Sequence, residues 1–86
     1  MILHVLEARY DRDYVISMRF NDGAEGYVDL RDELYGEVFT PLQDVERFRA
    51  FRVDPELGTI VWENGADLAP EFLHDRLLVA NGVRAQ

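Results

Sequence analysis

The sequence contains no cysteine and only one serine, and each shortage removes a class of function. Without cysteine the chain has no disulfide, no thiolate zinc site and no cysteine nucleophile. The one serine, Ser17, lies inside an alternating segment and lacks the G-x-S-x-G turn that exposes a serine nucleophile. The sequence therefore points away from disulfide-stabilised proteins, cysteine enzymes and serine hydrolases.

Long apolar runs and ligand-binding motifs are also missing. No stretch approaches the roughly 18 residues of a membrane span, and the N-terminus lacks the basic start and apolar run of a signal peptide. The two histidines, His4 and His74, have no metal-ligand spacing. Gly23 and Gly26 do not introduce a helix, unlike the glycines of a phosphate loop. We therefore expect a cytoplasmic protein that is not an enzyme, with no catalytic residue, metal or cofactor.

Positive charge is scarce, and negative charge is concentrated in one segment. All nine basic residues are arginines, against 17 acidic residues, so the formal net charge is −8. Residues 21–46 hold eight of the acids and only one base, Arg31. Binding to a phosphate backbone requires clustered positive charge, so we expect no direct binding to nucleic acid. The acidic segment suits a basic protein partner, or it is a solvated face that keeps a small domain soluble.

The segment 59–73, T-I-V-W-E-N-G-A-D-L-A-P-E-F-L, combines a strand, a tight turn and a helix start. Its opening residues are β-branched or aromatic, which favours a half-buried strand. Asn64-Gly65 tolerates positive φ and is a strong turn signal. Pro70 suits the first turn of a helix, where Glu71 complements the helix dipole. This densest local pattern in the chain is first of all a folding signal.

Alternating apolar residues and turn signals divide the rest of the chain. The first strand is expected to alternate strictly, with Leu6 and Ala8 on one face and Val5 and Glu7 on the other. We predict strands at 2–10, 14–20, 25–30, 51–53 and 59–62, helices around 42–48 and 70–80, and a helix C-cap at Asn81-Gly82. The result is a single α+β domain over residues 1–86. Two main helices cover one face of an antiparallel sheet, which is a three-stranded meander plus a β-hairpin.

Several of these motifs together resemble a known family. They are F-N-D-G (20–23), V-D-L (28–30), G-x-x-F-x-P-L (36–42) and above all G-T-I-V-W-E-N-G-A-D-L-A-P-E (58–71). On these motifs the chain is similar, over nearly its whole length, to the small bacterial family called domain of unknown function 2442. Glu63 departs from the pattern, because proline is more frequent there in this family.

The resemblance implies an α+β fold and a prokaryotic, cytoplasmic setting, but no reaction. Some members look as though a helix-turn-helix domain has been appended, and others look like the acidic half of a two-gene, toxin–antitoxin-like pair. We expect no appended DNA-binding domain in this chain. The two-gene role is therefore the one that the resemblance leaves for it.

Three functional hypotheses remain open. The first is a protein-interaction module, antitoxin-like, that binds a small basic protein. The second is a small-ligand-binding domain or enzyme with a pocket near Trp62 and Asp67, and the third is a structural homo-oligomer such as a homodimer. The candidate interaction residues are Trp62, Asn64, Asp67, Glu71, Asp29, Asp32 and Glu33. Asp67 is alternatively structural, because its carboxylate can accept a backbone hydrogen bond in an Asx turn.

Overall fold

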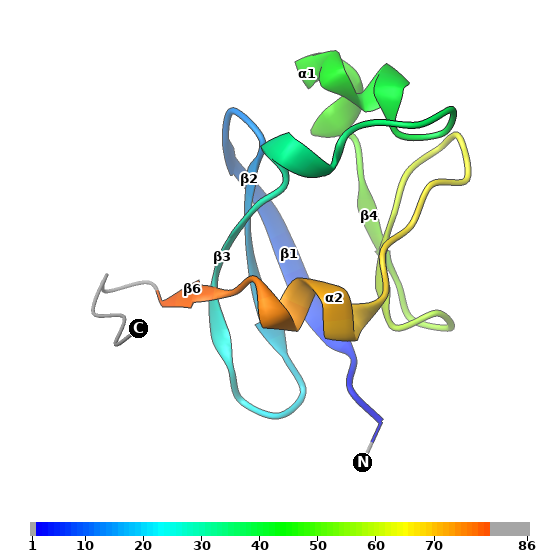
Figure 1. Cartoon of the computed structure of the whole chain (residues 1–86). Helices are drawn as coiled ribbons and strands as arrows, with labels where there is room; N and C mark the ends of the chain where they lie inside the picture. The colour runs from blue at the N-terminus through cyan, green and yellow to red at the C-terminus, as the bar shows by residue number, and fades with distance from the viewer. Residues whose placement is uncertain (1, 80–86) are drawn as a thin grey trace.

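The computed structural model describes residues 2–79, which form the elements drawn in Figure 1. The strands are β1 (Val5–Arg12), β2 (Val15–Phe20), β3 (Glu25–Asp29), β4 (Arg52–Asp54), β5 (Thr59–Val61) and β6 (Leu78–Val79). The helices are α1 (Val45–Phe48) and α2 (Pro70–Asp75), with 3₁₀ turns η1 (Arg31–Glu33) and η2 (Thr40–Gln43). The predicted α+β class is confirmed, with both the meander and the hairpin present.

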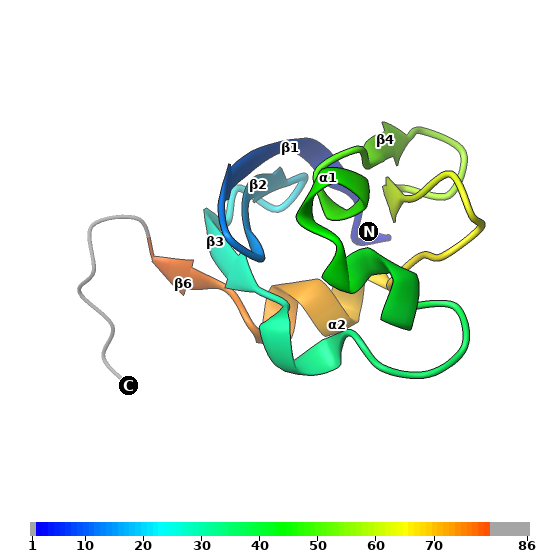
Figure 2. The same cartoon turned by 90° about the horizontal axis from the view of Figure 1, so that it is seen from above.

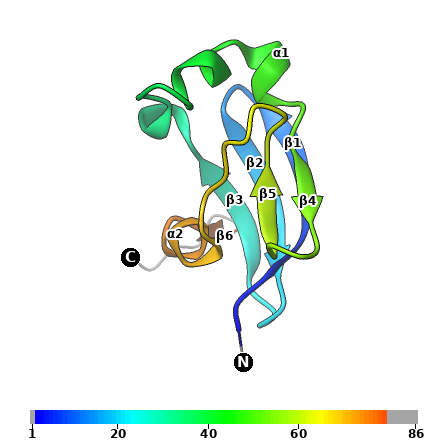
Figure 3. The ribbon, with the colours of Figure 1, turned by 90° about the vertical axis from the view of Figure 1, so that its right-hand side faces the viewer.

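The strands form two antiparallel sheets around a shared core. β1, β2 and β3 pair in sequence order, whereas β4 and β5 pair only with each other. Figure 3 shows the hairpin beside β1, with α2 on one side of the strands and α1 at their end. Ile16, Met18 and Phe20 alternate along β2 and are buried, as their spacing predicted.

A β-bulge in β1 contradicts the strict alternation expected there. Val5 pairs with Phe20 and Glu7 pairs with Arg19. Phe20 and Arg19 are adjacent in β2, so Leu6 is an extra residue that has no partner there. The extra residue reverses the side-chain parity. Val5 is therefore buried and Leu6 is exposed, while Ala8 still packs against the core. Parity could not be read from β1 alone, because a bulge exists only relative to the partner strand.

The C-terminal helix is shorter than predicted, and the chain then forms a strand. α2 ends at Asp75, and β6 pairs antiparallel with β3, with Gly26 opposite Val79 and Tyr27 opposite Leu78. The helix interpretation of 76–79 was wrong because the open edge of β3 offers backbone partners to this segment. Gly26 permits the approach, since a Cβ there would lie 1.9 Å from the Leu78 carbonyl oxygen. The predicted cap at Asn81-Gly82 lies outside the described residues.

The core draws one or more side chains from nearly every element. Aromatic rings meet around Phe48, which packs edge-on against Tyr14 at a centroid distance of 5.2 Å and lies 5.9 Å from Trp62. Leu73 of α2 covers the inner side of the sheet and is fully buried. The most deeply buried large side chains are Phe20, Phe48, Ile16, Leu30, Ile60, Leu73 and Val28.

The predicted Asn64-Gly65 turn is present between β5 and α2. Gly65 has a φ of 91°, and its N–H donates to the Trp62 carbonyl at 2.9 Å. The Asn64 side chain accepts a hydrogen bond from the Ala66 N–H at 3.1 Å. The Asx turn of this segment therefore starts at Asn64. Within residues 2–79 the Asp67 side chain makes no hydrogen bond, although its backbone forms a β-bridge with Val61.

We expect Gly65→Val to lower the free energy of unfolding by about 1–3 kcal/mol, because a β-branched residue is strained at positive φ. No atom lies within 4 Å of a Cβ built there, so the cost is assigned to backbone strain and not to a collision of the Cβ. Gly65→Asn is the matched control, since asparagine tolerates this conformation better. Chemical denaturation measures both, and equal stability of Gly65→Val and the wild type would show that this reading of the turn is wrong.

Candidate functional site

A groove lies near the predicted residues, between α1 and the turn after β5. Its volume is about 430 Å³, within the range of small-ligand sites. Two nearly buried side chains, Leu42 and Trp62, form its floor. Exposed side chains form its walls, which are Glu46, Arg47 and Ala50 on one side and Glu63 and Asn64 on the other.

Trp62 is foremost a core residue. Only 3% of its surface is exposed, and its ring packs against Phe39, Phe48 and Phe51. Its indole N–H donates to the Phe48 carbonyl oxygen at 2.7 Å, which ties the β5 turn to the end of α1. Trp62 therefore offers a bound molecule only a small part of its surface at the groove floor.

The other predicted residues of this segment do not share the groove. Asn64 lies on its wall, and its side-chain N–H donates to the Val38 carbonyl at 2.9 Å. Asp67 and Glu71 are exposed, but neither lines the groove. The structure brings Trp62 and Asn64 together and leaves Asp67 and Glu71 outside, so a single pocket built from all four residues is not formed.

The acidic candidates on the other segment, Asp29, Asp32 and Glu33, differ in what they contact. Asp29 accepts a hydrogen bond from the Arg31 N–H at 3.0 Å and so shapes the entry to η1. Glu33 pairs with Arg76 at 3.3 Å, linking η1 to the end of α2. Asp32 is exposed and makes no ion pair within residues 2–79. Of these three carboxylates, Asp32 is the one that a partner can reach without breaking an existing contact.

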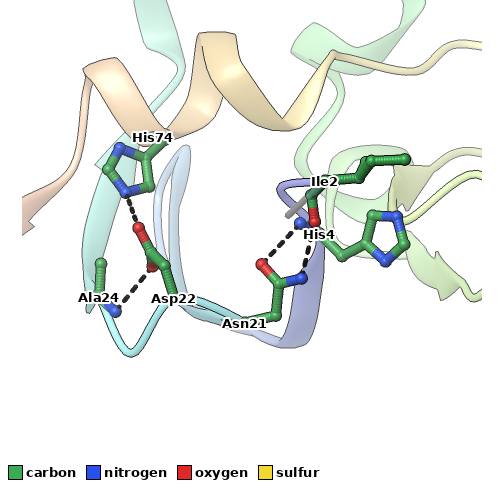
Figure 4. Close-up of polar contacts among 6 residues, drawn as sticks. All are labelled: Ile2, His4, Asn21, Asp22, Ala24 and His74. Carbon is green, nitrogen blue, oxygen red and sulfur yellow. Dashed lines mark hydrogen bonds and ion pairs between the residues drawn. The ribbon is translucent and has the colours of Figure 1, made fainter.

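The F-N-D-G motif is a structural junction, shown in Figure 4. Asn21 accepts a hydrogen bond from the His4 N–H at 2.9 Å and donates to the Ile2 carbonyl at 2.8 Å. Asp22 accepts from the Ala24 N–H at 3.0 Å and contacts the His74 ring nitrogen at 2.9 Å. The turn thus holds both the N-terminal segment and α2.

The His74–Asp22 contact was missed from sequence because its two residues lie 52 positions apart. The His74 ring also packs edge-on against Phe20, at a centroid distance of 4.9 Å. The other histidine, His4, packs close to Gly58, where an added Cβ would meet its ring at 2.5 Å. Among residues 2–79, no group of three or more His, Asp or Glu side chains is arranged to hold a metal ion.

Two carboxylates have pKa values below the usual value because they accept backbone hydrogen bonds. The Ala24 N–H is the largest cause of the lowered pKa of Asp22, and His74 lowers it further. The Leu57 N–H is the largest cause of the lowered pKa of Asp54, and the Glu56 N–H and Arg52 lower this pKa further.

These lowered pKa values predict that the fold becomes less stable in acid. A carboxylate whose pKa is lower in the folded state stabilises the fold above its unfolded pKa of about 4, and this contribution is lost as the pH falls through the folded value. We expect the unfolding midpoint to fall with pH below about 4, and Asp54→Asn to show a smaller fall. Thermal unfolding across this pH range tests it, with Asp11→Asn as the exposed control. An identical pH profile for Asp54→Asn and the wild type would contradict the assignment.

The fold and these contacts define a small acidic α+β domain, in which a meander and a hairpin enclose one core. The family described as "Protein of unknown function (DUF2442)" matches residues 5–77. The chain belongs to this family, as the sequence resemblance predicted. Comparisons with curated proteins and with solved structures give no match. Within the described residues, no helix is long and apolar enough to cross a membrane.

Proposed function

We propose that this protein is an interaction module of the bacterial cytoplasm that binds a small basic protein in an antitoxin-like role, and that it is not an enzyme. The observation that carries the proposal is the set of acidic side chains in segment 21–46, several of which are exposed. Its acids divide into those already bound within the fold and those that are free to meet a partner.

Several acids of the segment serve the fold. Asp22 and Glu33 contact His74 and Arg76, and Asp29 and Asp44 accept backbone hydrogen bonds. The acids that remain are exposed and make no ion pair or side-chain hydrogen bond within residues 2–79; they are Glu25, Asp32, Glu37 and Glu46. We call these four residues the free acids. Their unneutralised charge supports attraction of a basic partner and rapid association.

The test is capture of partners from the native lysate by the tagged protein at about 0.1 M and about 1 M salt, where the screening length falls from ~10 to ~3 Å. A stoichiometric basic protein should be retained at low salt and lost at high salt. The variant Asp32→Asn/Glu37→Gln should retain it roughly tenfold less well, because rim charges steer and strengthen association.

The matched control is Glu56→Gln/Asp75→Asn, which removes the same charge from exposed positions outside the segment. Equal loss of partner retention in both variants would show that the effect depends on net charge alone. A basic partner whose retention does not change with salt would contradict the electrostatic mechanism.

Simpler measurements test the two other candidate functions. The groove volume favours a small-ligand-binding domain as the second candidate, although Asp67 does not line the groove. A small molecule that raises the unfolding temperature of the purified chain, with no partner protein present, would support it. The solution mass of the purified chain tests the third candidate, a structural homo-oligomer.

A further inference from the structure

We propose that the groove between α1 and the β5 turn binds an arginine side chain of the basic partner. In this arrangement the guanidinium lies at the Glu46 and Glu63 carboxylates, and the methylene stem lies on Ala50 and the small exposed parts of Leu42 and Trp62. The inference rests on the proposed function, since it names the part of the surface that recognises the partner.

The two carboxylates come from different elements, and no side chain within residues 2–79 pairs with them. Glu46 lies on α1 and Glu63 on the turn after β5, and both line the groove and are exposed. Neither takes part in an ion pair or a side-chain hydrogen bond within residues 2–79, in contrast to Glu33, which pairs with Arg76. Their charge is therefore available to a ligand that enters the groove.

The presence of one carboxylate on each wall of the groove favours arginine over lysine. A guanidinium is planar and has five N–H donors, so it can bond to carboxylates on two walls at once, whereas an ammonium is a compact point charge. The long apolar stem of arginine packs on hydrophobic surface while its head stays polar. The exposed Ala50 provides such surface, together with the small exposed parts of Leu42 and Trp62 at the groove floor.

The walls are held in place by bonds that already serve the fold. The Trp62 indole N–H donates to the Phe48 carbonyl at 2.7 Å, which joins the floor to the end of α1. Asn64 donates to Val38 at 2.9 Å and accepts from Ala66 at 3.1 Å, which holds the opposite wall. A site formed before the ligand arrives loses less conformational entropy on binding.

Arg47 allows a test of the sign of the ligand's charge, because it is the one basic residue among those lining the groove. It opposes an incoming guanidinium by like-charge repulsion. Replacing Arg47 with glutamine should therefore strengthen the binding of an arginine ligand, whereas Glu46→Gln/Glu63→Gln should weaken it. A ligand with a carboxylate head would show the opposite signs.

The probe is a short blocked peptide with one central arginine, compared with the same peptide carrying neutral, nearly isosteric citrulline. Binding is followed by NMR at the Trp62 indole N–H and the Asn64 side-chain amide. We expect both signals to shift with the arginine peptide. The affinity should be at least about threefold weaker for the citrulline peptide and for Glu46→Gln/Glu63→Gln.

The control variant Glu56→Gln/Asp75→Asn should bind the arginine peptide as the wild type does. Equal shifts with both peptides, no shift at millimolar peptide, or shifts confined to the η1 region around Asp32 would each overturn the arginine site. Thermal unfolding of each variant shows that the exposed substitutions leave the fold intact.

Partner capture separates failure of this site from failure of the proposed function. If Glu46→Gln/Glu63→Gln retains the basic partner as well as the wild type does, the arginine site is wrong and the interaction module stands. If the wild type captures no basic partner, the proposed function fails, and the peptide experiment still decides what the groove binds.

Discussion

Replacing Trp62 with alanine is expected to lower the free energy of unfolding by about 3–5 kcal/mol, the range for removing a buried aromatic side chain. The ring is 3% exposed and contacts Phe39, Phe48 and Phe51. Its loss would leave a cavity among these rings and remove the donor that satisfies the Phe48 carbonyl. For a domain of 86 residues this is a large part of the total stability.

Trp62→Phe separates the two contributions. It keeps an aromatic ring in the cluster but leaves the Phe48 carbonyl without its donor, so we expect a loss of about 1–3 kcal/mol. Urea denaturation, followed by circular dichroism because the only tryptophan is removed, measures both variants. An unchanged midpoint for Trp62→Ala would mean that Trp62 is a contact residue and not part of the core.

The second large effect is expected from Gly26→Ala, which should detach β6 from β3. The added Cβ would lie 1.9 Å from the Leu78 carbonyl oxygen and 2.8 Å from its carbonyl carbon, both backbone atoms that cannot rotate away. Overpacking of this kind costs about 1–3 kcal/mol, or the local pairing separates instead. Hydrogen exchange should show lost protection at Leu78 while the β1–β2 amides remain protected.

Gly23→Ala is the informative comparison. Gly23 has a φ of 92° and no atom within 4 Å of an added Cβ, so alanine there adds strain without a collision. We expect lower global stability with β6 still paired. Retained protection at Leu78 in Gly26→Ala would refute the role assigned to Gly26.

Several predictions that depended only on neighbouring residues were confirmed. The alternation of β2, the Asn64-Gly65 turn and the start of α2 at Pro70 all follow from steric and hydrogen-bonding preferences within a few positions. The α+β class followed because these local elements, taken in order, allow few ways to share one core.

Features that depend on a distant partner were missed. Leu6 points outward because of a bulge relative to β2, and β6 exists because Gly26 leaves room for Leu78. The His74–Asp22 contact joins residues 52 positions apart, and no local sequence pattern predicts it. For the candidate site, Trp62 and Asn64 line the groove, whereas Asp67 and Glu71 do not, and the α1 residues that form the other wall were not among the predicted residues.

The sequence by itself determined the fold class, the family, the turn after β5 and the excess of negative charge, because each depends on composition or on residues close in the chain. Only the tertiary structure decided which acids are free, since that depends on whether a carboxylate meets Arg76, His74 or a backbone N–H. It also decided that Trp62 belongs mainly to the core and that Glu46 and Glu63 face the same groove. Burial and charge pairing are properties of the packed chain, so they are set where distant segments meet.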